Sequence, residues 1–162
     1  MCDASRYSAD RILNSGKSLL VVPGGATEAL YTVPDVDVLY LKKRKGFVRL
    51  AIQHGASLVP IFSFNEANTY NQLSINIPAV KWAKTKFQAI FGMSLPLITN
   101  ILPKRVPVVS VIGKPVTVKK IENPTDEQIM EVLDRYIQAV KELYTEYGPK
   151  YNTQPNKKLE IV

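Results

Sequence analysis

The stretch Leu19–Gly25, with the sequence LLVVPGG, decides the fold prediction. Four consecutive apolar residues followed directly by turn formers are typical of a strand buried in a parallel sheet. The stretch Leu58–Phe64 also predicts a strand because it is rich in β-branched and aromatic residues. Two more strands are predicted at Val36–Leu41, where apolar residues alternate weakly, and at Val106–Ile112. Helical patterns lie between and after these strands, and such alternation indicates an α/β fold.

Apolar residues at helical spacing predict the helices. The segment 44–54 places four residues on one face, and Gly55 supplies a stop: Phe47, Leu50, Ala51 and His54. The last helix is the clearest, because Thr125 and Gln128 form a capping box and Gly148-Pro149 follows its apolar stripe. That stripe is predicted to contain Ile129, Val132, Leu133, Tyr136, Val140, Leu143 and Tyr147. A short helix is also expected over Ser5–Asn14.

These elements together predict a mixed, mostly parallel sheet flanked by helices, with a long C-terminal helix. A chain of 162 residues with 46% hydrophobic residues fits one domain, here assigned to residues 1–151. Residues 152–162 are interpreted as a polar C-terminal tail, and the segment Asn152–Lys158 is expected to be loose.

Composition narrows the function classes. The net charge of +7 favours anionic partners, which include phosphates, an anionic lipid surface and nucleic acid. Cys2 and His54 are the only residues of their kinds, which excludes a conventional zinc site, and no metal is predicted. No stretch approaches the roughly 18–20 apolar residues that span a bilayer.

Five stretches in this order resemble the type-2 diacylglycerol acyltransferase family, which also includes monoacylglycerol and wax-alcohol acyltransferases. They are VPGGATEAL at 22–30, RKGFVRLA at 44–51, HGASLVPIFSF at 54–64, IGKPV at 112–116 and NPT at 123–125. Each stretch alone is a weak signal, whereas their order and spacing cover almost the whole chain. The resemblance implies a fold like that of glycerolipid acyltransferases.

The sequence departs from the family pattern in two places. The family usually has Gly-Glu after the third stretch, and Asn65-Glu66 stands here. Family members also carry hydrophobic membrane segments and then a His-Pro-His-Gly motif before these stretches, and neither occurs in this sequence. The resemblance therefore marks the chain as the C-terminal portion of such a protein, an N-terminally truncated fragment.

The resemblance implies an O-acyltransferase that moves a fatty acyl group from acyl-CoA to a lipid hydroxyl, with diacylglycerol as the first choice of acceptor and triacylglycerol as product. It implies acyl-CoA as co-substrate, no bound cofactor, and a place at the endoplasmic reticulum membrane and lipid droplets. The implied partners are acyl-CoA, a lipid alcohol and the membrane surface, with a homo-oligomer left open. Nucleic acid is not expected, because aromatic and basic residues are not interleaved in an RNA-binding pattern.

Glu28 is the predicted catalytic residue. It follows a strand and a Gly-Gly turn, where backbone N–H groups can approach a ligand. By resemblance, Glu28 orients the missing histidine or holds the acceptor hydroxyl; the alternative is that it only caps a short helix. Gly24 and Gly25 are turn residues on either interpretation, with a role in stabilising an oxyanion on the first.

Substrate binding is predicted at Gly24, Gly25 and the segment Arg44, Lys45, Gly46 and Phe47. Lys42–Lys45 and Arg49 cluster where a helix begins, and positive charge there opposes the helix dipole. This unfavourable placement suggests the phosphates of coenzyme A as a partner. A solvated basic face, or one that touches lipid headgroups, is the alternative. His54 shares a face with Phe47 and Leu50 and is interpreted as a packed or capping histidine.

A basic amphipathic helix is predicted within residues 79–91. Its apolar stripe holds the predicted membrane-interface residues Val80, Phe87, Ile90 and Phe91, with lysines outside the stripe. The alternative is that this stripe faces the protein's own core. A second functional hypothesis also stays open at this point: a catalytically inactive relative that binds lipid surfaces or regulates a longer one.

Overall fold

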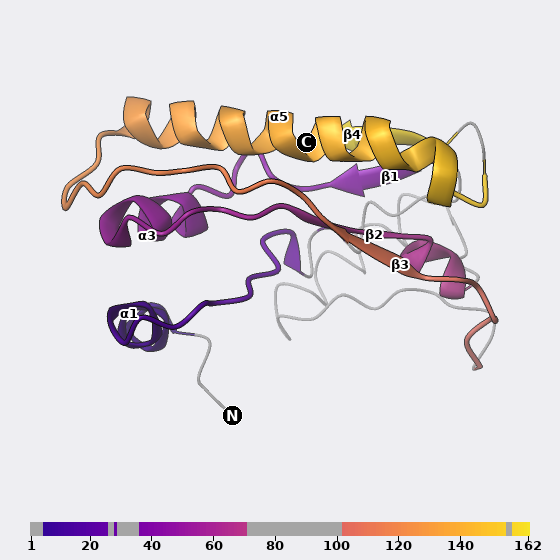
Figure 1. Cartoon of the computed structure of the whole chain (residues 1–162), viewed down its shortest axis with the longest axis horizontal. Helices are drawn as coiled ribbons and strands as arrows, with labels where there is room; N and C mark the ends of the chain where they lie inside the picture. The colour runs from indigo at the N-terminus through magenta and orange to yellow at the C-terminus, as the bar shows by residue number, and fades with distance from the viewer. Residues whose placement is uncertain (1–4, 26–27, 29–35, 71–101, 155–156) are drawn as a thin grey trace, which may run out of the picture.

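The computed structural model describes residues 5–25, 28, 36–70, 102–154 and 157–162. The described elements are helices combined with short strands, which confirms the predicted α/β class (Figure 1). In chain order they are α1 (Arg6–Asn14), β1 (Val36–Leu39), α3 (Gly46–His54), β2 (Ile61–Phe64), the 3₁₀ helix η1 (Glu66–Thr69), β3 (Val109–Ile112), α5 (Asp126–Tyr151) and β4 (Lys158–Ile161).

The described strands form two separate pairs. β1 and β4 are parallel, with a register that runs from Val36 opposite Lys158 to Leu39 opposite Ile161. β2 and β3 are antiparallel, and an isolated bridge between Leu58 and Val116 extends this pair. The expected mostly parallel sheet is therefore, within the described residues, one parallel and one antiparallel pair.

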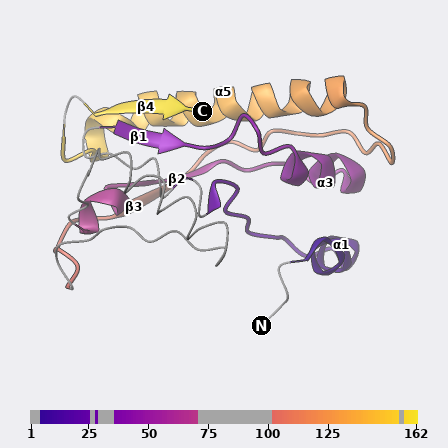
Figure 2. The same ribbon diagram turned by 180° about the vertical axis from the view of Figure 1, so that it is seen from behind.

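Helix α5 runs the length of the described structure and packs against strands of both pairs (Figures 1 and 2). Its buried face contributes to two hydrophobic clusters. The first cluster is built from α3, α5 and the ends of β1 and β4, and contains Leu41, Val48, Ile52, Ile129, Val132, Leu133, Ile137 and Ile161. The second lies under β2 and contains Phe62, Phe64, Leu143 and Tyr144. Burial of these side chains holds both sheets to one helix.

The prediction of a buried strand at Leu19–Val22 is wrong. These residues have no regular secondary structure, and the side chains of Leu20 and Val22 are 79% and 75% exposed. An apolar run becomes a buried strand only if a neighbouring strand pairs with it and other layers cover its faces. None of the strands in the described ranges pairs with this stretch.

The predicted starts of α1 and α5 are confirmed, whereas α3 begins at Gly46, two residues after the predicted start at residue 44. The Ser5 side chain accepts a hydrogen bond from the Ser8 N–H and caps α1. Thr125 and Gln128 form both bonds of the capping box at the start of α5. Gly55 ends α3 with a φ of +64°, in the left-handed region that glycine favours at this position.

The predicted end of α5 is wrong, because the helix continues through Pro149 to Tyr151. A proline weakens the turn before it by removing one donor. Here, two hydrogen bonds tie the last turn. The Asn152 N–H donates to the Gly148 carbonyl at 2.9 Å, and the Asn65 side-chain amide donates to the Tyr151 carbonyl at 2.7 Å.

The buried faces of both helices differ from the predicted stripes. In α3 the buried residues are Val48, Ala51 and Ile52, whereas Phe47 and Leu50 are half-buried. In α5 the buried set includes Ile137 and Tyr144, two positions that the predicted stripe lacks. Both helices carry apolar residues on adjoining faces. Which of these residues become buried depends on the elements that pack against the helix and not on periodicity alone.

The end of the chain is held in the fold rather than loose. Lys157 and Ile161 are buried, and β4 forms the parallel ladder with β1. A polar composition suggested a solvated tail, but pairing with a strand far away in sequence satisfies this backbone.

Candidate active site

Glu28 and the Gly-Gly turn form one compact unit. A β-carbon added to Gly24 would collide with the Glu28 carboxyl group and would lie 2.8 Å from the Glu28 β-carbon. Gly24 is itself buried, so the carboxyl group folds back over bare backbone. Gly25 has a φ of +56°, which L side chains adopt rarely. The two glycines thus serve different purposes, space at Gly24 and backbone conformation at Gly25.

The Glu28 carboxylate is held by the start of the next segment. Its Oε2 accepts a hydrogen bond from the Tyr40 N–H at 3.0 Å. Burial raises the pKa of Glu28, the Tyr40 N–H lowers it, and nearby Glu66 and Arg44 raise and lower it respectively. A carboxyl group in such surroundings holds a proton more readily than one in water, as general acids and bases often do.

Arg44 points toward the same turn. Its Nη2 donates to the Gly24 carbonyl at 3.2 Å, and its guanidinium lies 5.0 Å from the centroid of the Tyr40 ring. The structure therefore brings together Gly24, Glu28 and Arg44, three residues that the sequence analysis proposed for one site. Arg44 thus contacts both the Gly-Gly turn and Tyr40 of this protein.

Helix α3 begins beside this unit. Lys45 is its N-cap residue, without a side-chain cap bond, and Gly46 is its first residue. The Phe47 ring packs edge-to-face on Tyr136 of α5, with centroids 5.3 Å apart. Burial raises the pKa of Tyr136, and the Glu28 charge raises it further. The charge of Glu28 thus acts on Tyr136, which its place in an apolar helical stripe did not indicate.

The basic cluster divides into paired and exposed members. Arg49 forms an ion pair with Asp126 at 3.2 Å, and both side chains are largely exposed. The pKa of Glu127 is lowered by its own N–H and the Thr125 side chain, with a smaller effect from Lys45. Lys42 and Lys43 are exposed on the turn before α3. The acidic residues at the start of α5 therefore offset part of the positive charge at the start of α3.

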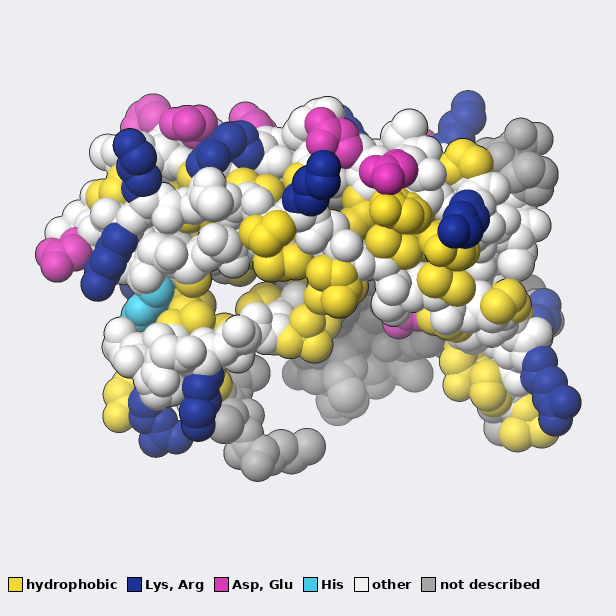
Figure 3. Space-filling view, viewed as in Figure 1, with side chains coloured by type: hydrophobic (Ala, Val, Ile, Leu, Met, Phe, Trp, Pro, Cys, Tyr) yellow, Lys and Arg dark blue, Asp and Glu magenta, His cyan; other side chains and the backbone are white. Residues whose placement is uncertain are grey.

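His54 has a structural contact. Its Nε2 lies 2.9 Å from Asp10 Oδ1, and the His54 side chain is 15% exposed. Figure 3 shows this histidine in cyan, between α3 and α1. It stands at the end of α3 remote from Gly46, so its interpretation as a packed histidine is confirmed.

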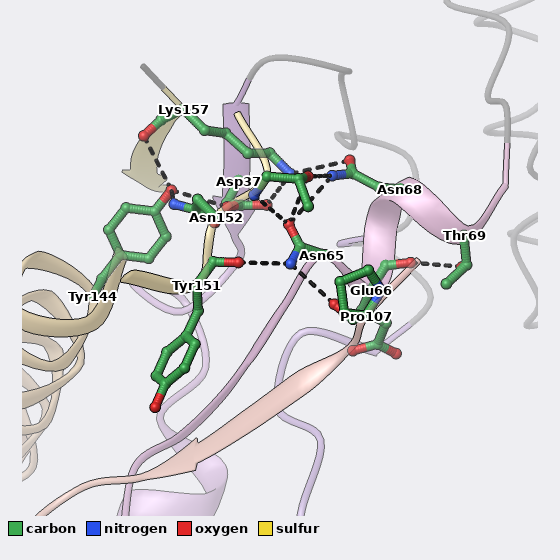
Figure 4. Close-up of polar contacts among 11 residues, drawn as sticks. Asp37, Asn65, Glu66, Asn68, Thr69, Pro107, Tyr144, Tyr151, Asn152 and Lys157 are labelled. Atoms are coloured by element: carbon green, nitrogen blue, oxygen red, sulfur yellow. Dashed lines mark hydrogen bonds and ion pairs between the residues drawn. The ribbon is translucent and has the colours of Figure 1, made fainter. Parts of the chain in front are cut away.

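Asn65 explains how this chain departs from a Gly-Glu turn. Its φ is +64°, the left-handed conformation that asparagine tolerates better than most residues. Its buried amide donates to the carbonyls of Pro107 and Tyr151 and accepts from the Thr153 N–H and hydroxyl (Figure 4). Asparagine thus keeps a glycine-like backbone and joins η1 to the end of α5.

Other predicted site residues lie outside the described residues, namely Val80, Phe87, Ile90 and Phe91. In the part of the chain that the structure describes, no helix combines the length and apolar character needed to cross a membrane. The same part holds no group of three or more histidine, cysteine or acidic side chains placed to bind a metal ion.

Comparisons with known proteins match the whole chain. A sequence model of the diacylglycerol acyltransferase family matches residues 1–162. A similar protein is diacylglycerol O-acyltransferase 2B of Umbelopsis ramanniana, 40% identical over 93% of this chain and 48% of that relative. Another is 2-acylglycerol O-acyltransferase 1 of Mus musculus, 39% identical over 91% of this chain and 48% of the mouse protein.

The human diacylglycerol O-acyltransferase 2 is 33% identical over 99% of this chain and 45% of its own length. The chain thus spans about half the length of the curated relatives it matches. No solved structure matches it. The full-length match and these identities show that the chain belongs to the diacylglycerol acyltransferase family.

Proposed function

We propose that this chain is the part of an acyl-CoA-dependent O-acyltransferase that presents Glu28 to the acceptor hydroxyl. The acceptor is a lipid alcohol, with diacylglycerol first, and the product is the corresponding ester. One observation carries the proposal: a partly buried glutamate folds over a Gly-Gly turn and is held by the Tyr40 N–H, in a member of this family.

The reaction needs a base and a leaving group. The acceptor oxygen forms a bond to the thioester carbonyl carbon, its proton passes to a base, and the C–S bond breaks to release coenzyme A. A histidine is the common base for such a hydroxyl, and the only histidine here, His54, pairs with Asp10. The base is therefore assigned to a histidine outside these 162 residues. Glu28 either orients that histidine or holds the acceptor hydroxyl beside it.

Two surfaces are assigned to the substrates and the membrane. Exposed Lys42 and Lys43 are suited to the phosphates of coenzyme A, because both ammonium groups are free to turn toward solvent. Gly24 and Gly25 provide backbone beside Glu28, where an oxyanion would need donors. The helix predicted over 79–91 is assigned to the membrane interface, at the endoplasmic reticulum or a lipid droplet.

The test is a chimera in which this chain replaces the matching half of the Umbelopsis ramanniana 2B enzyme. We expect transfer of labelled oleate from oleoyl-CoA to diacylglycerol, and a loss of about 100-fold on Glu28→Gln. Glu127→Gln is the matched control, since that carboxyl group is exposed at the start of α5 and lies in no proposed site. A folded chimera without transfer, or one indifferent to Glu28→Gln, would contradict the proposal.

A second candidate is a catalytically inactive protein that binds lipid surfaces. The observation that favours it is the exposed apolar stretch with Leu20 and Val22, together with a histidine engaged elsewhere. Flotation of the 162-residue chain with phosphatidylcholine–phosphatidylserine vesicles tests it, with a Leu20→Ser, Val22→Ser variant for comparison. Binding that depends on both residues, together with an inactive chimera, would favour this candidate.

A further inference from the structure

The backbone that binds Glu28 is also the backbone that pairs with the end of the chain. β1 is followed by residues 40–42, and their partner beyond β4 is Val162. The Val162 N–H donates to the Leu39 carbonyl at 2.9 Å, and the Val162 carbonyl accepts from the N–H groups of Leu41 and Lys42 at 2.9 and 3.0 Å. One edge of residues 39–42 is therefore hydrogen-bonded to Val162, the residue that follows β4.

The backbone N–H of Tyr40 lies on the opposite edge of this segment from Val162. In an extended backbone, the N–H groups of successive residues point in opposite directions. Because the Leu39 carbonyl and the Leu41 N–H both point to Val162, the Tyr40 N–H points away from it, and it donates to Glu28 Oε2. Glu28 and the end of the chain thus bind opposite edges of one short segment.

A buried ion pair anchors the start of the same strand. Lys157 Nζ lies 2.7 Å from Asp37 Oδ1, and the two side chains are only 1% and 12% exposed. The other Asp37 oxygen accepts a hydrogen bond from the Tyr144 hydroxyl at 2.9 Å (Figure 4). A two-stranded parallel ladder is weak by itself, so this anchor adds to the burial of Ile161 in holding β4 beside β1.

We propose that β4, anchored by Lys157, positions Glu28 by fixing the segment that carries the Tyr40 N–H. Lys157 is then a positioning residue, which acts through Asp37, β1 and Tyr40 without meeting the substrate. Its relevance to catalysis rests on the proposed function of Glu28. The positioning itself is a property of the chain that is measured without any acyl transfer.

The groups that face Glu28 define what the measurement reports. Besides burial, they are the Tyr40 N–H, Glu66 and Arg44, and Tyr136 on α5 senses the Glu28 charge in return. A hydrogen bond to the charged form lowers a carboxyl pKa. If the Tyr40 N–H moves away while the other groups stay, the pKa of Glu28 rises further above its ordinary value.

The experiment is a pH titration of the 162-residue chain by NMR, with carboxyl-labelled glutamate and a ¹⁵N-labelled backbone. In the parent chain, we expect the Tyr40 amide shift to follow the Glu28 carboxyl titration with the same midpoint. In Lys157→Met, we expect the Tyr40 amide to stop following it and the Glu28 midpoint to rise. The matched control is Lys158→Met, the same change at the next position, where the side chain is exposed; it should titrate like the parent.

Lys157→Met leaves Asp37 buried and unpaired, which is a costly state and can unfold a small domain. A second variant that lacks Val162 keeps the ion pair and removes only the partner of residues 39–42; it should give the same changes. If Tyr40 still follows Glu28 at the parent midpoint in whichever of these variants is folded, the proposal is overturned. An inactive chimera beside a positive titration would instead reject the acyltransferase proposal alone.

Discussion

The carboxyl group of Glu28 occupies the space that a side chain at position 24 would need. This relationship makes Gly24 the most informative residue to change. Gly24→Ala should displace Glu28 from the Tyr40 N–H and lower acyl transfer in the chimera about as much as Glu28→Gln, about 100-fold. Because the new β-carbon would also lie 2.8 Å from the Glu28 β-carbon, the side chain cannot relieve the clash by rotating alone, and the free energy of unfolding should fall by about 1–3 kcal/mol.

Gly148→Ala is a suitable comparison for that variant. The nearest atom to its new β-carbon is Asn152 Nδ2 at 3.4 Å, an ordinary contact, and alanine favours a helix over glycine. Its activity should match the parent. Equal activity of Gly24→Ala and the parent would show that the position of Glu28 does not matter for transfer.

The pH dependence of stability should carry the signature of Glu28. Its pKa is raised in the folded state, so the folded chain holds this proton more tightly than the unfolded chain. The resulting stability is fully present below the ordinary glutamate pKa and is lost as the pH rises through the folded pKa. Urea unfolding at pH 4 and pH 8 should show a larger decline for the parent than for Glu28→Gln; an equal decline would contradict the raised pKa.

Asn65 allows the backbone and side-chain contributions to be separated. Asn65→Ala keeps neither the left-handed preference nor the buried hydrogen bonds, whereas Asn65→Gly loses only the bonds. Asn65→Gly should therefore be the more stable of the two by about 1–2 kcal/mol, measured by urea unfolding. Because both variants lack the amide bonds, the reverse order would contradict a conformational cost of the positive φ at position 65.

His54→Gln should leave acyl transfer by the chimera within about twofold of the parent. The contact of His54 with Asp10 joins α3 to α1, and a polar contact of this partly exposed kind is worth about 0.5–1.5 kcal/mol at most. The free energy of unfolding should therefore fall slightly or not at all. A loss of transfer comparable to that of Glu28→Gln would return His54 to the list of candidate bases.

Local signals predicted much of the fold. The capping box at Thr125, the stop at Gly55 and the strand at Val36 depend on neighbours in sequence, and the structure has all three. The failures involve long-range packing. Leu19–Val22 has the composition of a buried strand, but none of the described strands pairs with it. Lys157 lies in a polar segment that was expected to be loose, but its side chain is buried against Asp37.

The candidate site shows the same division. A Gly-Gly turn followed by a glutamate indicated Glu28, and the structure explains both glycines through space and backbone conformation. The roles of Tyr40 and Tyr136 could not be read from sequence, because a backbone donor has no side-chain signature and a tyrosine in an apolar stripe resembles core. The sequence also could not show that Arg44, and not one of the lysines beside it, would bind the Gly24 carbonyl.

The parallel pairing of β1 with β4 has a consequence for biosynthesis. Leu39 pairs with Ile161, from which it is separated by most of the sequence. During translation this ladder therefore cannot form until β4 has left the exit tunnel of the ribosome. Until then, β1 lacks its β4 partner and residues 39–42 lack their hydrogen bonds to Val162. Chaperone demand and premature degradation should therefore stay high until residues 157–162 have emerged from the exit tunnel.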